Sequence, residues 1–401
     1  MFPKFSRNLW LLWFGTIVSA IGNELNAIAF SVYVLQRYDS IYLMSLTKAF
    51  SHLPRAIGGM IAGPIVDHFP KVPILVICDV VRGLNLIVMA VSAYFFDLAL
   101  WVVWAVAVTN SFLDAFFDTA SQTVIPKVTN EGELVKTYSL FTTSNQIVEI
   151  GMKAASGLLL AFFGPLPLFI FDGVSFVLSG ISEAFIKIKE NTDSRAPLRF
   201  TTKFKEGILY LREKRDLFRL LTVLGLSNVF AIGGFVGLLP YCKGIEHYGL
   251  EYYGYFLSIG GFGYLVGALA TAKIPPSKYY LIFCVSFLVH NLHWLLFLSH
   301  ELAMISFVQF FVNGLFMSSV SIIVQTKVVE STDEQYLGRV MALLGVILTA
   351  LSPLSMVLVG YSADIFGAKE TMIATYTSSL GFSLLVVATS YVRSSFSTES
   401  N

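Results

Sequence analysis

The chain has 401 residues, of which 55% are hydrophobic and only 13% are charged; its formal net charge is +1 and its mean hydropathy is +0.71. Soluble domains carry about twice that share of charged residues, so the composition excludes an ordinary soluble protein. The sequence contains no nucleotide-binding loop, catalytic triad or metal-hydrolase motif, and its three cysteines are too scattered for a disulfide framework or a metal site. We therefore expect neither an enzyme nor a cofactor, and no nucleic-acid partner.

Windows of 18 or more largely apolar residues recur along the whole chain, and each predicts a membrane-spanning helix. The first window follows Lys4 and Arg7, but it is too long for a signal peptide and lacks a cleavage site. The fold class predicted is an all-α integral membrane protein with twelve spans. They are expected at residues 8–34, 41–66, 73–96, 98–124, 137–163, 166–187, 217–240, 252–272, 279–299, 302–326, 338–362 and 371–392.

Basic residues between the spans predict the orientation of the chain. With the N-terminus inside, the outer loops carry only Arg37, Lys243 and Lys369. The inner segments carry the other basic residues that lie between spans, including a dense group from Lys187 to Arg219. Because cytoplasmic loops are enriched in Lys and Arg, both termini are predicted to be cytoplasmic.

A repeat of six spans is visible in the sequence. Gln122-Thr123 recurs as Gln325-Thr326, and the offset of 203 residues continues without a gap through Gly157 and Gly360. Parallel repeats joined by a linker are typical of one group of transporters. We therefore predict three parts, a bundle at 1–188, a basic linker at 189–216 and a bundle at 217–401. The linker is read as a tether containing an amphipathic helix on the lipid surface, with a regulatory partner site as the alternative.

Charged residues inside the spans are confined to the first half. Each costs about 2.5–3.5 kcal/mol at a helix centre, so their number indicates a shared polar interior. They are Glu24, Lys48, Arg55, Asp79, Arg82, Asp114, Asp118, Glu149 and Lys153. The second half is expected to be a mostly apolar counter-surface, where His290 and His293 lack the nearby acid or cysteine that a metal site needs.

These charges are predicted to form two layers. At roughly 1.5 Å per residue, Asp79, Arg82, Asp114 and Asp118 lie about 10–15 Å from the cytoplasmic end, and Arg55 lies at about the same depth. We interpret this inner layer as a helix clamp or a latch of the closed state rather than a substrate contact. The outer layer, about 20–27 Å deep by the same rise, holds Glu24, Lys48, Glu149 and Lys153. Lys48, His52 and Arg55 share one face of the second span, which assigns Arg55 to this layer as well.

The residues of the outer layer allow two interpretations. At least one carboxylate binds protons or substrate, or the layer forms a permanent salt bridge. Counting five interior carboxylates against four interior cations leaves one acid without a permanent partner. An acid that gains and loses a cation changes its proton affinity, which would couple protons to transport. Glu24 is the first candidate and Glu149 the second. The full set predicted for proton coupling and substrate binding is Glu24, Asn23, Asn26, Lys48, Arg55, Asn145, Glu149, Lys153 and Asp114.

The loop after the second span carries a family resemblance. It reads GPIVDHFPKVPIL and matches G-x-x-x-D-R-x-G-R-R/K-x-x-L, a signature of the major facilitator superfamily, at Gly63, Asp67, Lys71 and Leu75. The segments ICDVVRG, FLDAFFDTASQTVIPKV and GELVKTYSLFTTSNQIVEIG resemble the macrolide-efflux and enterobactin-exporter-like drug antiporters. The resemblance implies two parallel six-helix repeats and a cytoplasmic gate. Gate residues are expected at Gly63, Asp67, Lys71, Asp79, Arg82 and Asp118.

The resemblance also implies a function, which is proton-coupled export of an amphipathic small molecule by alternating access. The expected setting is the bacterial plasma membrane, with a small molecule, protons and the lipid bilayer as partners and a monomer as the working unit. An importer or a flippase of a lipid or metallophore is the alternative within the class. A membrane scaffold or sensor with the same fold is the alternative outside it, although a scaffold has little need of buried titratable groups.

Overall fold

The computed structural model describes residues 6–130, 133–188, 208–244, 248–333, 336, 340, 343–344, 347 and 351–388. These residues form helices, turns and short connections, without a β-strand among them, as the predicted fold class requires. The first six helices are α1 (Arg7–Tyr38), α2 (Ile41–His68), α3 (Lys71–Phe95), α4 (Leu100–Val128), α5 (Leu134–Phe163) and α6 (Pro165–Ala184). The later ones are α8 (Arg215–Val236), α9 (Leu238–Gly244), α10 (Gly249–Thr271), α11 (Tyr279–Leu298), α12 (Ala303–Glu330), α14 (Ser352–Phe366) and α15 (Ala368–Ala388), with a 3-10 turn at Pro276–Lys278.

Local sequence signals set several of these helix ends. Ser6 caps α1, because its side chain accepts a hydrogen bond from the Leu9 N–H at 3.1 Å. Asp39 ends the same helix in a left-handed conformation, with φ of 50°. Gly164, at φ of 73°, separates α5 from α6, and Pro165 follows as the first residue of α6, where a missing N–H costs nothing.

Nine stretches among the described helices are long and apolar enough to cross a membrane. The nine correspond to predicted spans, with α8 and α9 together making the seventh. The predicted spans at 41–66 and 137–163 are the helices α2 and α5. The predicted span at 338–362 is described in part, through α14 and a few residues before it.

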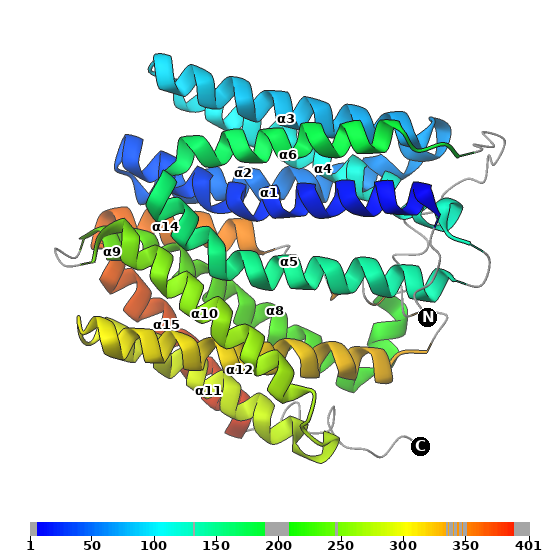
Figure 1. Ribbon diagram of the computed structural model, residues 1–401. Helices are drawn as coiled ribbons and strands as arrows, with labels where there is room; N and C mark the ends of the chain where they lie inside the picture. The colour runs from blue at the N-terminus through cyan, green and yellow to red at the C-terminus, as the bar shows by residue number, and fades with distance from the viewer. Residues whose placement is uncertain are drawn as a thin grey trace. The chain divides into compact units, whose positions relative to one another are not determined.

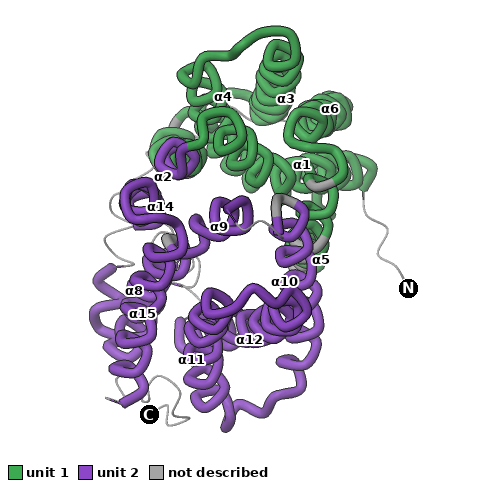
Figure 2. The backbone as a smooth tube through the Cα atoms, turned by 90° about the vertical axis from the view of Figure 1, so that its left-hand side faces the viewer, with its two compact units in different colours: residues 1–39, 47–198 green, residues 40–46, 199–401 purple. Residues whose placement is uncertain are grey.

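The chain divides into two compact units (Figure 2). Unit 1 comprises residues 1–39 and 47–198, and unit 2 comprises residues 40–46 and 199–401, so the first turn of α2 belongs to unit 2. Residues 189–207 of the expected linker lie outside the described residues, and residues 208–213 after them are helical.

The same helix pairs pack within both units. In unit 1, α6 packs on α1 and α3, while α4 packs on α3 and α5 packs on α1 (Figure 1). In unit 2, α15 packs on α8 and α11, while α12 packs on α11 and α14 packs on α8. Among the described helices, these four pairs correspond in chain order between the two units, in agreement with the 203-residue repeat.

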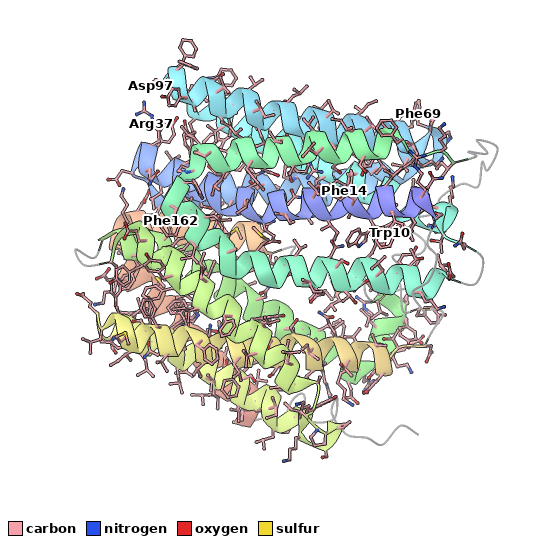
Figure 3. The ribbon with its side chains drawn as sticks, in the orientation of Figure 1. Trp10, Phe14, Arg37, Phe69, Asp97 and Phe162 are labelled. Atoms are coloured by element: carbon pink, nitrogen blue, oxygen red, sulfur yellow. The ribbon has the colours of Figure 1, made fainter. Side chains whose placement is uncertain are left out.

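One end of unit 1 carries an exposed ion pair. Arg37 near the end of α1 pairs with Asp97, which follows α3, and both side chains are exposed (Figure 3). Arg37 is one of the three basic residues expected on the outer side.

Candidate functional site

A buried arginine on α3 gathers polar groups from three helices of unit 1. The Arg82 side chain is 2% exposed, and its Nη1 lies 3.3 Å from Oδ1 of Asp79, one turn earlier on the same helix. Its Nη2 lies 2.7 Å from Oδ1 of Asp114 on α4 and donates to Oδ1 of Asn23 on α1 at 3.0 Å. Arg82 therefore ties α1, α3 and α4 together in the interior.

Asp114 connects this buried arginine to a second, more exposed one. While Oδ1 of Asp114 faces Arg82, its Oδ2 lies 3.0 Å from Nη1 of Arg55 on α2. Nη2 of Arg55 also contacts a carboxylate oxygen of Asp118, one turn further along α4. The side chains of Arg55 and Asp118 are 54% and 42% exposed, against 14% for Asp114. We call these five residues, Asp79, Arg82, Asp114, Arg55 and Asp118, the arginine network; it runs from a sealed end at Asp79 to an open end at Arg55.

An aromatic ring and two amides hold the buried arginine in place. The guanidinium carbon of Arg82 lies 3.9 Å from the centre of the Phe176 ring on α6, a cation–π contact that is strong when water is excluded. Asn110 on α4 donates to the Arg82 carbonyl at 3.3 Å and accepts a hydrogen bond from Asn85 at 3.0 Å. Movement of Arg82 would disturb contacts on α1, α4 and α6 together.

The network joins residues from both predicted sets. Asp79, Arg82 and Asp118 were expected at a gate, whereas Arg55 and Asp114 were expected at the coupling site. The face of α2 shared by Lys48, His52 and Arg55 suggested an outer position for Arg55. Its long side chain instead reaches the acids of α4, so Arg55 belongs with the inner layer.

The other predicted coupling residues lie on α1, α2 and α5. Glu24, Lys48 and Glu149 are half-buried, and the Glu149 carboxylate accepts a hydrogen bond from Gln146 at 3.4 Å. Asn145 is exposed, and the Lys153 side chain lies outside the described part of the structure. Asn26 is half-buried on α1, and its Oδ1 has no hydrogen-bond partner among the described residues.

The predicted signature loop spans the end of α2 and the start of α3. Gly63 is half-buried on α2, and Lys71 is buried at the first position of α3. Asp67 lies in the last turn of α2, and its side chain is outside the described part of the structure. The gate role of these three residues stays a prediction.

Two buried acids on α6 were missed by the sequence analysis. Asp172 and Glu183 are both 0% exposed, so the count of five interior carboxylates was wrong for the first half. A signal was present, because Asp172, Ser175, Ser179 and Glu183 recur at helical spacing and form one polar stripe. The stripe was not recognised because α6 is otherwise apolar and its two acids are 11 residues apart.

Unit 2 has a different interior. His293 and Trp294 on α11, Phe310 on α12 and Tyr376 on α15 form ring contacts with centroids 4.7–5.6 Å apart. Nδ1 of His290 lies 3.0 Å from Oδ1 of Asn313 and donates the hydrogen bond to it. Over the described residues, no group of three or more His, Cys, Asp or Glu side chains is arranged to hold a metal ion.

Comparison with known proteins identifies relatives across almost the whole chain. A family model described as Major Facilitator Superfamily matches residues 12–355. "Macrolide efflux protein A" of Streptococcus pyogenes is 24% identical over 384 residues, covering 94% of each chain. "Uncharacterized MFS-type transporter YvqJ" of Bacillus subtilis (strain 168) is 21% identical over 373 residues, covering 91% of this chain and 88% of the relative. "Multidrug efflux pump Tap" of Mycolicibacterium fortuitum is 30% identical over 123 residues, 30% of each chain.

Solved structures share the fold. The nucleoside transporter NupG superposes with a TM-score of 0.73 at 11% identity, over 95% of this chain and 98% of that one. A POT family transporter superposes with a TM-score of 0.72 at 11% identity, over 96% of both chains. At such low identity the likeness concerns the fold alone.

Proposed function

The chain belongs to the Major Facilitator Superfamily, and on that premise we propose that it exports an amphipathic small molecule in exchange for protons. As a member of this family it is a multi-pass membrane transporter and not an enzyme. The proposal adds three things to that identity, namely the direction of transport, the class of substrate and the coupling ion.

The arginine network is the observation that carries the proton coupling. It places two guanidinium groups against three carboxylates, with Asp114 shared between both cations. A carboxylate that loses its cation binds a proton more readily, and one that regains it releases the proton. Because Arg55 and Asp118 are about half exposed, water can deliver protons to that end of the network.

Glu24 and Glu149 are proposed as the acids through which protons compete with substrate. Both are half-buried on α1 and α5, the two helices of unit 1 whose contact includes the Trp13 indole donating to Ser144 at 3.0 Å. Asn23 stands next to Glu24 and bonds to Arg82, so a change at Glu24 is one residue from the arginine network. We propose that this adjacency transmits protonation between the two layers.

The relatives support the proposed substrate class. One is named for macrolide efflux and another for multidrug efflux, and both terms describe export of bulky, partly apolar compounds. Among the described residues, the interior of unit 2 is mostly aromatic and apolar, so the buried charges that could handle protons belong mainly to unit 1.

Transport into inverted membrane vesicles tests the proposal. With an imposed proton gradient, acid inside, an exporter should accumulate a radiolabelled macrolide in inverted vesicles, and a dye should report the matching loss of protons. Uptake in right-side-out vesicles alone would identify an importer. Translocation of a fluorescent lipid without drug uptake would identify a flippase. Absence of any substrate-dependent flux, with folded protein present, would favour a scaffold or sensor.

A further inference from the structure

The polar stripe of α6 forms a sealed acid row inside unit 1. Asp172, Ser175, Ser179 and Glu183 lie on one helix face and are at most 4% exposed. Helix α6 runs between α1 and α3, which cover this face (Figure 1). The row spans about three turns of the helix.

Glycines on α1 explain how acids can sit in a helix–helix contact. A Cβ placed on Gly22 would come within 2.0 Å of Asp172 Oδ1 and 2.3 Å of Ser175 Oγ. A Cβ on Gly15 would come within 2.9 Å of Ser179 Oγ. Small residues at such contacts let two membrane helices approach closely. The backbone of α1 therefore closes directly over the acid row and keeps water from it.

The charges around the row do not balance. The charged groups that face Asp172 are Arg82 and Asp79 on α3 and Asp114 on α4. Those that face Glu183 are again Arg82 and Asp79, together with the neutral thiol of Cys78. Asp79, Asp172 and Glu183 are all 0% exposed, and among the described residues Arg82 is the cation that faces the two α6 acids, although it is already bound to Asp79 and Asp114.

The hydrogen bonds of the two α6 acids suit neutral carboxyl groups. Asp172 Oδ1 lies 3.4 Å from Ser175 Oγ, and Glu183 Oε1 lies 3.5 Å from Ser179 Oγ. Asp172 Oδ2 and Glu183 Oε2 have no partner among the described residues. An ionised carboxylate sealed from water needs a cation or several short hydrogen bonds to be stable. A protonated carboxyl group, in contrast, needs only a hydroxyl as its hydrogen-bond partner.

We propose that Asp172 and Glu183 are a proton-binding pair, each holding one proton in the resting protein, and that the pair is a proton store beside Arg82. Binding is simple protonation of a carboxylate oxygen, so no other reactant is involved. Since Arg82 faces both acids, a shift of Arg82 away from Asp114 toward either acid would favour the ionised acid and release its proton. The pair adds a second proton site to the proposed exporter without depending on substrate.

Infrared spectroscopy of the purified full-length protein at pH 7 tests the proposal. Asp172→Asn and Glu183→Gln should each remove part of the carbonyl band of protonated carboxyl groups, and the double variant should remove both parts. Asp97→Asn is the matched control, because Asp97 is 84% exposed and paired with Arg37, and it should leave the band unchanged. An unchanged band in both α6 variants would overturn the proposal.

A second pair of variants keeps the test valid if these substitutions prevent folding. Ser175→Ala and Ser179→Ala retain both acids but remove their hydroxyl partners, so the band should move to higher frequency. An unmoved band in both serine variants would also overturn the proposal. Spectra recorded in sodium chloride and in choline chloride should agree. Loss of the carbonyl band in sodium chloride alone would mean that the acid row binds a metal cation instead of protons.

The pH dependence of unfolding in detergent gives an independent readout. The unfolded chain releases both protons at neutral pH, so by linkage the unfolding equilibrium should shift by up to about tenfold per pH unit for each held proton, with stability falling as pH rises. The double variant should lose that slope between pH 6 and 9. If stability depends on pH equally in the wild type and the double variant, the pair does not store protons. None of these measurements uses substrate, so failed export and a failed proton store are distinguishable.

Discussion

Where the first and last helices of unit 1 meet, glycines on α1 make room for Asp172 and Ser179 on α6. Where the first and last helices of unit 2 meet, Gly234 on α8 lies against the ring of Tyr376 on α15, which a Cβ would approach within 2.5 Å. The two contacts are equivalent in the repeat, and both depend on a missing side chain. One is filled by carboxyl groups and the other by an aromatic ring.

This difference separates what the fold requires from what the function requires. If buried charge were needed to hold six helices together, unit 2 would need it as well. Unit 2 instead packs Trp294 against Tyr376 with ring centroids 4.8 Å apart, and its buried side chains are mostly apolar. The buried acids and arginines of unit 1 therefore lower the stability of the fold. We take their purpose to be the binding and release of protons.

The largest effect is expected on transport, from Glu24→Gln in unit 1. The variant should lose proton-driven accumulation of drug almost completely while still exchanging drug across the membrane, because the amide cannot carry a proton. Glu330→Gln in unit 2, at an exposed position paired with Lys327, should keep full accumulation. Both are measured in the inverted-vesicle assay. Equal loss in the two variants would remove the asymmetry between the units, and unchanged accumulation in Glu24→Gln would remove Glu24 from the mechanism.

Arg82→Met should cause the largest loss of stability. It leaves Asp79 and Asp114 without their buried cation, and breaking a buried pair in this way costs about 3–5 kcal/mol. Arg37→Met removes an exposed pair and should cost less than about 1 kcal/mol. Thermal unfolding in detergent measures both. If the two variants lose equal stability, the arginine network does not hold α1, α3 and α4 together as described.

Glycine contacts should be equally sensitive in both units, because they belong to the shared scaffold. A Cβ on Gly83 of α3 would lie 2.6 Å from the Gly173 carbonyl oxygen, and one on Gly314 of α12 would lie 2.0 Å from that of Gly260. Since backbone must move in each case, Gly83→Ala and Gly314→Ala should each cost about 1–3 kcal/mol. Gly151→Ala on α5, with no atom within 4 Å of the new Cβ, should be neutral or stabilising by about 0.5–1 kcal/mol. A harmless Gly83→Ala would show that α3 and α6 are not in backbone contact.

The same contrast shows how far sequence could lead. Apolar windows predicted the helical membrane fold, and depth along the spans grouped Asp79 and Arg82 with Asp114 and Asp118. Residue spacing within one helix cannot show which neighbouring helix covers a given face. The burial of Asp172 beneath Gly22 therefore could not be predicted from the sequence. Arg55 was placed by its helix face, while its position in the structure depends on the reach of a long side chain toward Asp114.

The smallest effect is expected at an acid of unit 2 that is fully partnered, in contrast to Asp172. Asp364 on α14 accepts hydrogen bonds from the Ser40 hydroxyl and the Ile41 N–H, each at 2.7 Å, and from the Tyr42 N–H at 3.2 Å. It thereby caps the first turn of α2, which belongs to unit 2. Asp364→Ala should cost about 1 kcal/mol, as loss of a helix cap does, and Asp364→Asn less, because an amide oxygen still accepts from N–H groups. Thermal unfolding of Asp364→Asn and of Asp172→Asn compares the two acids directly. Asp364→Asn loses a charged acceptor and should be slightly destabilised, whereas Asp172→Asn replaces an acid that is neutral when folded and ionised when unfolded, so it removes the cost of taking up a proton on folding and should be more stable than the wild type at pH 7. The opposite order would mean that Asp172 is ionised and that the two units treat their acids alike.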